Sequence, residues 1–257
     1  MGAVVADAFA RPRPRLRGVD ATTTLQDFAI VTFAVDADRL AKLLPAGLTP
    51  EVRRLDNECE AAFVSAVSFR DVDFRFAIAP RIRASFFQTN YRAYVFGPDG
   101  RRAVFFFGTT LDSWLVVLPR VAWEMPWHGG RTRLEARWDT DRRCIAYRHR
   151  CSGRWGAAEV ELEGTGTPAG RLDGFVDADD AATVLTHPLD GYFRRRDGTL
   201  GRYAVWHERL RPQLGIPRQT AYAIFQEMGL VVPGAVAHSV LLQQAVDFDV
   251  LLPPTRV

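Results

Sequence analysis

The run FFQTNYRAYVF at residues 86–96 decides the fold class, because it is dense in aromatic and β-branched side chains. It is followed by the turn sequence GPDG at residues 97–100 and by a second apolar run, RAVFFF, at residues 102–107. Two such runs joined by a short Gly- and Pro-containing turn are typical of a β-hairpin. We therefore expect a fold that is organised around β-sheet.

The strand expected at 86–96 has two different faces. Asn90, Arg92 and Tyr94 share one face, because successive residues of a strand point in opposite directions. The other face carries side chains suited to packing, namely Tyr91, Ala93 and Val95. One face is therefore predicted to be polar, and the other to pack.

Similar short runs recur along the chain. Strands are expected at residues 28–35, 60–69, 131–138, 143–150, 157–163, 192–196, 201–208 and 236–252. Asp36 is expected to cap a short helix that ends at Pro45, and Asp177 to cap a helix over residues 179–185. Many short strands with few helices predict a mainly β (α+β) fold whose sheet is closed or nearly closed.

The length and composition fit one globular domain. The chain has 257 residues, of which 47% are hydrophobic and 25% charged, as in proteins that bury a full core. We expect a single domain over residues 21–257, preceded by a flexible arm at residues 1–20 that contains the run ARPRPRLRG. Lys42 is the only lysine among 33 basic residues.

Several classes of function lack their sequence signatures. Three cysteines do not make a disulfide framework, and no apolar run is long enough to span a membrane, so a soluble cytoplasmic protein is expected. Cys144 is expected on the opposite strand face from His149 and Cys151, which argues against a metal site. The chain has no nucleophile-elbow or phosphate-loop sequence and no basic face with interleaved aromatic residues. We therefore expect no cofactor and no nucleic-acid partner.

Polar residues on strands are the best candidates for a ligand site. Arg92, if it points inward, needs either a carboxylate of the protein or the carboxylate of a ligand. His207 and Glu208 are adjacent, so only one of them can enter a cavity as an acid-base group. A surface ion pair is the alternative for Glu208, and these residues alone leave both questions open.

Several ordered motifs resemble one family. They are VDADRLAKLLPAGL at 35–48, NYRAYV at 90–95, VFFF at 104–107 with LDS at 111–113, VWHE at 205–208 and VDFDV at 246–250. Together they make the chain similar to the YqjF-like proteins, which are related to the acetoacetate decarboxylase superfamily. The resemblance implies a large, strongly bent antiparallel sheet that forms a cone-like β-barrel around a ligand cavity, with a few short helices.

The resemblance also shows which catalytic residues are missing. The decarboxylases have a proline followed by two lysines, one of which forms a Schiff base while its neighbour lowers its pKa. Here Pro126 is followed by Trp127 and His128, and neither can form an imine. The carboxylate and the arginine that the decarboxylases keep near the cavity fall at Asn90 and Gln26. The resemblance therefore implies the fold without Schiff-base chemistry.

Two functions remain for the expected cavity. In the first, it binds a small apolar or keto-acid-like ligand without turnover, and the expected ligand-binding residues are Asn90, Arg92, Tyr94, Trp127 and Glu208. In the second, a lysine-independent lyase, hydratase or isomerase acts on a carbonyl compound with His128 or Glu124 as acid-base. The lack of a complete nucleophile set favours binding. Apolar strands near the chain's end also leave room for a homo-oligomer.

Overall fold

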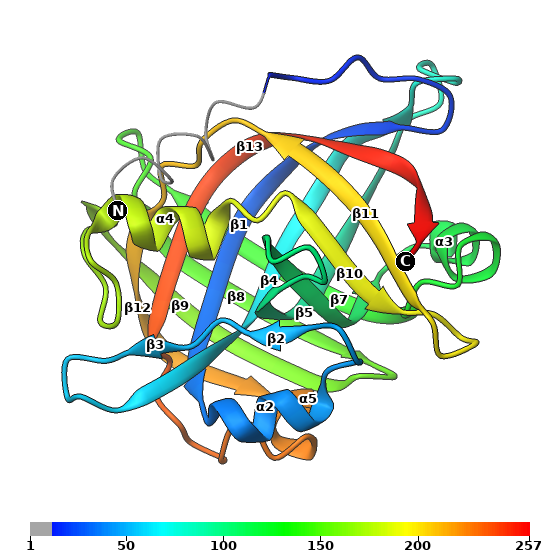
Figure 1. The fold of residues 1–257 in the computed structure, drawn as a ribbon. Coiled ribbons are helices and arrows are strands. Elements are labelled where there is room, and N and C mark those ends of the chain that lie inside the picture. The colour runs from blue at the N-terminus through cyan, green and yellow to red at the C-terminus, as the bar shows by residue number, and fades with distance from the viewer. Residues whose placement is uncertain (1–11) are drawn as a thin grey trace.

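A single 13-stranded sheet dominates residues 12–257, which are the residues that the computed structural model describes (Figure 1). Its strands are β1 (Ala21–Val35), β2 (Thr49–Pro50), β3 (Arg53–Arg54), β4 (Glu60–Phe76), β5 (Ala84–Phe96), β6 (Arg102–Leu111), β7 (Trp127–Trp138), β8 (Cys144–Gly153), β9 (Gly156–Pro168), β10 (Asp190–Arg194), β11 (Leu200–His207), β12 (Gln213–Tyr222) and β13 (Ser239–Arg256). The helices are α2 (Ala37–Leu43), the 3-10 turn η1 (Trp114–Val116), α3 (Val117–Ala122), α4 (Ala178–Thr186) and α5 (Ala223–Glu227). Part of the arm expected at residues 1–20 lies outside the described residues.

Branching at strands β6 and β13 closes the sheet on itself by two routes. β6 pairs with β5, β7 and β10, and β13 pairs with β1, β11 and β12. Strands β1, β4, β5, β6 and β13 belong to both routes; β10 and β11 complete one route, and β7, β8, β9 and β12 complete the other. The pairings described are antiparallel except β6–β7 and β6–β10. The expected bent, cone-like sheet is confirmed.

The shared strands separate two hydrophobic cores. On β5, Tyr91 and Ala93 pack into a core that they form with β7, β8, β9 and α5. Tyr94 points the other way, into a core formed with α4, β10 and β11, because side chains alternate along a strand. The face of β5 that the sequence predicts to be polar is therefore also covered by protein.

Both predicted helix starts are confirmed. The Asp36 carboxylate accepts a hydrogen bond from the backbone N–H of Arg39 at the start of α2, at 2.7 Å. The Asp177 carboxylate does the same for Asp180 at the start of α4, at 2.8 Å. Such bonds satisfy backbone donors that have no partner inside the helix. No helix in the described part of the chain is long and apolar enough to cross a membrane.

The end of the chain departs from the prediction. β13 continues past Pro253 and Pro254 to Arg256, whereas the sequence suggests a stop before the prolines. The prolines fall where the pairing of β13 with β11 is irregular, between the Leu251 and Thr255 positions, so their missing N–H groups interrupt no regular ladder. Strand β12 and helix α5 were not expected, because the Gly and Pro residues in the β12 sequence are more typical of a loop.

Cys144 lies on the same side of β8 as His149 and Cys151, and the expectation that it lies opposite them is wrong. The pairing of β8 with β7 shifts between Ala146 and Cys144, so Ile145 is an extra residue in the strand. An extra residue reverses the side-chain alternation beyond it, and all three side chains are buried. Within residues 12–257, no group of three or more His, Cys, Asp or Glu side chains is arranged to hold a metal ion.

Candidate functional site

A cavity of about 120 Å³ lies in the second core, between the shared strands and the pair β10 and β11. Most of its lining is apolar and includes Leu25, Phe28, Val67, Phe69, Phe106 and Phe248. Leu118 and Pro119 of α3 contribute a further part of the lining. A concave, mainly apolar space with a few polar groups is the usual form of a small-molecule site.

Three polar side chains of β5 reach the cavity, namely those of Gln88, Asn90 and Arg92. They are two residues apart, so the pleat of the strand directs them to the same face. The Asn90 carbonyl oxygen accepts hydrogen bonds from Gln88 at 2.8 Å and from the Thr109 hydroxyl at 2.9 Å. These bonds fix the orientation of the Asn90 amide in the cavity wall.

Arg92 is a cation without a counter-charge. Its Nη2 donates to the carbonyl oxygen of Leu185 at 2.8 Å and to the Tyr94 hydroxyl at 3.4 Å. Its Nε is buried without an acceptor, and no carboxylate among residues 12–257 forms an ion pair with it. The partners that the protein supplies to this guanidinium are therefore neutral.

Asp71 of β4 contributes a carboxyl group to the cavity lining, and the sequence did not identify it as a site residue. Its side chain is only 4% exposed. The Thr23 hydroxyl donates to Oδ1 at 3.0 Å, and Oδ2 has no partner. Burial raises the pKa of this carboxyl to about 7, although the Thr23 bond acts in the opposite direction. The strand predicted at 60–69 ends two residues too early to include Asp71; continued alternation after Phe69 was the signal available.

Of the adjacent pair His207 and Glu208, the histidine enters the cavity. His207 is 2% exposed and lines the cavity, and its Nδ1 donates to the backbone carbonyl of Glu208 at 2.8 Å. Burial lowers the pKa of His207 to about 4, so the imidazole is neutral at physiological pH. The Glu208 side chain is exposed and does not belong to the lining.

Of the candidate site residues at the turn before β7, one lines the cavity and the others do not. Trp127 lines the cavity, whereas His128 packs edge-on against Trp155, with ring centroids 5.3 Å apart. Partial burial, together with nearby arginines, lowers the pKa of His128. Glu124 lies 3.6 Å from the guanidinium of Arg195. Neither His128 nor Glu124 lines the cavity.

Tyr94 supports the cavity wall from behind. Its hydroxyl bonds to the Leu185 carbonyl oxygen at 3.1 Å and to the Ser65 hydroxyl at 2.8 Å, and its ring is buried. The structure thus places Asn90, Arg92 and Trp127 at the cavity, and Tyr94, Glu208, Glu124 and His128 outside its lining. Lys42 is exposed on α2.

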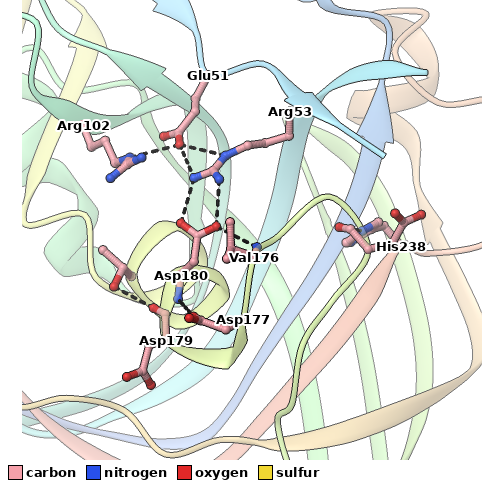
Figure 2. Close-up of polar contacts among 10 residues, drawn as sticks. Glu51, Arg53, Arg102, Val176, Asp177, Asp179, Asp180 and His238 are labelled. Atoms are coloured by element: carbon pink, nitrogen blue, oxygen red, sulfur yellow. Dashed lines mark hydrogen bonds and ion pairs between the residues drawn. The ribbon is translucent and has the colours of Figure 1, made fainter. Parts of the chain in front are cut away.

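Helix α4 shapes the Arg92 end of the cavity, and buried ion pairs hold its first turn (Figure 2). Arg53 of β3 lies 2.8 Å from the carboxylate of Asp180 on α4 and 2.7 Å from that of Glu51. Arg102 of β6 reaches the same Glu51 carboxylate at 3.0 Å. These contacts tie the helix that carries the Leu185 carbonyl oxygen to the edge of the sheet.

Comparisons with known proteins identify a family model that matches the chain and solved structures with a similar fold. The family model for DUF2071, an uncharacterized conserved protein (COG2071), matches residues 22–247. Acetoacetate decarboxylase from Legionella pneumophila subsp. pneumophila is similar in structure, with a TM-score of 0.59, 15% identity, and coverage of 100% of this chain and 96% of that chain. An acetoacetate decarboxylase-like enzyme from Sphingomonas wittichii RW1 has a TM-score of 0.57 and 14% identity, over 96% of this chain and 97% of that one.

A third similar structure is the enduracididine biosynthesis enzyme MppR complexed with pyruvate, with a TM-score of 0.63, 12% identity, and coverage of 94% of this chain and 91% of that chain. No curated protein matches the sequence. At such identities the structural likeness establishes the fold alone, whereas the family model spans most of the chain. The resemblance to acetoacetate decarboxylase-like proteins is confirmed, and the chain belongs to the DUF2071 family of uncharacterized conserved proteins.

Proposed function

We propose that this protein binds a small carboxylate ligand in its internal cavity, with Arg92 as the anchor. One observation carries the proposal: the Arg92 guanidinium lines the cavity and lacks a carboxylate partner among the described residues. A largely buried cation without a counter-charge is unfavourable. A ligand carboxylate would supply that charge, and it matches the two-pronged geometry of a guanidinium.

The remaining lining supports a small, partly apolar acid. Phe28, Phe69 and Phe106 offer apolar contact area, and Trp127 offers an aromatic ring for a planar group such as a keto acid. The binding of pyruvate by MppR, a protein of the same fold, supports a ligand of this chemical class. We propose binding without Schiff-base formation, because Lys42 is exposed on α2 and does not line the cavity.

The alternative, a lysine-independent enzyme that uses His128 or Glu124 as acid-base, is the weaker candidate. Those side chains contact Trp155 and Arg195 instead of lining the cavity. A general acid or base must come within hydrogen-bonding reach of the substrate. We also propose that the protein works in the cytoplasm, because all three of its cysteines are unpaired thiols.

Titration with straight-chain and 2-oxo monocarboxylates tests the anchor, with the fluorescence of the cavity tryptophans Trp123 and Trp127 as readout. We expect Arg92→Gln to weaken binding about tenfold or more, the cost of losing a charge-assisted hydrogen bond. Arg70→Gln is the matched control, since Arg70 is exposed on β4 and is not part of the lining. Equal affinities for Arg92→Gln and the wild type would contradict the proposal.

A further inference from the structure

Asp71 is the feature of the cavity that carboxylate binding leaves unexplained. It is only 4% exposed, and it lines the same cavity as Arg92. Its Oδ1 accepts from Thr23, but its Oδ2 has no hydrogen-bond partner. A buried polar atom without a partner is destabilising unless something else satisfies it. The unpaired oxygen therefore points to a group that the ligand brings.

Asp71 and Arg92 belong to different ends of the cavity. Asp71 pairs in register with Phe86 of β5, and Arg92 follows six residues later on the same strand. Six residues of strand span about 20 Å, so the two side chains belong to different levels of the cavity. The apolar residues Val67 and Phe69 line the cavity between these levels.

The surroundings of Asp71 favour the uncharged form of its carboxyl group. Its register neighbours are Leu25 on β1 and Phe86 on β5, and the nearby polar side chains of the lining are those of Thr23 and Gln88. None of these four is charged. The ionisable groups in the rest of the lining are Arg92, Asp190, Tyr203 and His207. Arg92 contributes to the pKa shifts of Tyr203 and His207, whereas the pKa of Asp71 responds to burial and to Thr23.

We propose that the ligand is an elongated monocarboxylate that ends in an uncharged carbonyl oxygen, with its carboxylate at Arg92 and that oxygen hydrogen-bonded to the protonated Asp71 carboxyl. The inference rests on the proposed anchor role of Arg92. A protonated carboxyl is a donor, whereas an ionised one only accepts. With a pKa of about 7, Asp71 is mostly protonated below neutral pH. A ligand with a second carboxylate would meet repulsion at this end whenever Asp71 ionises.

This ligand class differs from 2-oxo and 3-oxo acids. In those acids the carbonyl oxygen lies next to the carboxylate, so an acid held at Arg92 keeps its carbonyl at that end. Only a chain of several methylene groups carries a carbonyl oxygen across the apolar middle of the cavity to Asp71.

Two matched series of probes test the inference in fluorescence titrations at pH 6 and pH 8.5. One series contains straight-chain monocarboxylates of increasing length, and the other contains acids of the same lengths that end in a methyl ketone. At pH 6 and at one optimal length, we expect the wild type to bind the ketone acid about tenfold more tightly than its unsubstituted counterpart, which is the value of one well-made hydrogen bond in a desolvated site. At pH 8.5 this preference should largely disappear.

Two variants assign the preference to Asp71. Asp71→Leu should lose it at both pH values, whereas Asp71→Asn, whose amide donates at any pH, should keep it at both. A preference that survives unchanged in Asp71→Leu overturns the inference, as does the lack of a preference at every chain length in the wild type. Titration of Arg92→Gln with the unsubstituted acids tests the anchor alone. Weaker binding than in the wild type supports the anchor and unchanged binding contradicts it, so a failure of the proposed function is recognised separately. Pyruvate should bind equally to the wild type and Asp71→Leu.

Discussion

A step of one residue decides which side chains reach the cavity. Trp127 lines it while His128 packs outside against Trp155, and His207 lines it while Glu208 is exposed. Alternation along a strand makes such neighbours opposites. The neutral imidazole of His207 therefore belongs to the cavity lining, whereas the candidate acid-base groups Glu208 and His128 are held outside it.

The stability of the protein should depend on pH through Asp71. Its pKa is about 7 in the folded protein against an ordinary 3.8, so the folded state holds this proton more tightly than the unfolded chain. The stabilising contribution is complete below pH 3.8 and is lost as the pH rises through 7. Asp71→Asn removes this loss, so at pH 8 its free energy of unfolding should exceed that of the wild type by up to about 4 kcal/mol, at about 1.4 kcal/mol for each pKa unit.

Urea unfolding at pH 4, 6 and 8 measures this difference. The advantage of Asp71→Asn should be small at pH 4 and should grow toward pH 8. Asp141→Asn, a change at an exposed turn residue, is the control and should follow the wild type throughout. An advantage of Asp71→Asn that stays constant with pH would show that the carboxyl is already ionised in the acid range.

Individual cavity residues were only partly predictable from the sequence. The alternation of β5 correctly groups Asn90 with Arg92, because a regular strand has a period of two. Tyr94 shares that face but does not line the cavity, since its hydroxyl reaches Ser65 and the Leu185 carbonyl oxygen in the wall. Asp71 was missed because it lies beyond the predicted strand end. Which face of a strand holds a cavity is decided by strands far away in the chain, and the local pattern carries no information on them.

At the scale of elements, helix α4 acts as a fixed part of the cavity. Its first turn is tied to β3 through Asp180 and Arg53, and its end supplies the carbonyl oxygen of Leu185 to Arg92. The side chains of Glu51, Arg53 and Asp180 are largely buried. A charge left alone in such surroundings costs far more than one at the surface. The network therefore couples the edge of the sheet to the position of the Arg92 guanidinium.

Arg53→Met should lower the free energy of unfolding by about 3 to 5 kcal/mol, because it leaves Glu51 and Asp180 buried with fewer partners. Arg171→Met is the matched control, since Arg171 pairs with Asp56 in an exposed ion pair, and it should change the free energy of unfolding far less than Arg53→Met does. Chemical denaturation of the two variants at one pH compares them directly. Similar costs for both would mean that the Arg53 contacts are solvated in solution.

At the scale of the whole molecule, the β class and the cone-like shape followed from the sequence, but the path of the sheet did not. Repeated short strands and the hairpin at 86–107 are local patterns, and they are confirmed in β5 and β6. The branching of the sheet at β6 and β13 depends on contacts between distant segments. Two of these contacts are parallel pairings, which short turns cannot make. No local periodicity predicts such pairing.

The chemistry of the whole chain is limited by its single lysine. Borohydride reduction in the presence of pyruvate or acetoacetate should leave Lys42 unmodified, because its side chain is exposed on α2 and does not line the cavity. Peptide mass spectrometry of the treated protein measures this, with Lys42→Arg as the control. A keto-acid adduct on Lys42 in the wild type that depends on Arg92 would contradict binding without an imine.

The position of β5 between two cores has a consequence for how this protein can change. The odd-numbered side chains from Tyr91 to Val95 hold the first core together, so substitutions there are constrained by packing. The even-numbered residues Gln88, Asn90 and Arg92 are exposed to the cavity and can be exchanged with much smaller effects on that core. One strand thus carries the scaffold and the ligand preference in alternate positions. A new specificity can arise by exchanging every second residue, without a new fold.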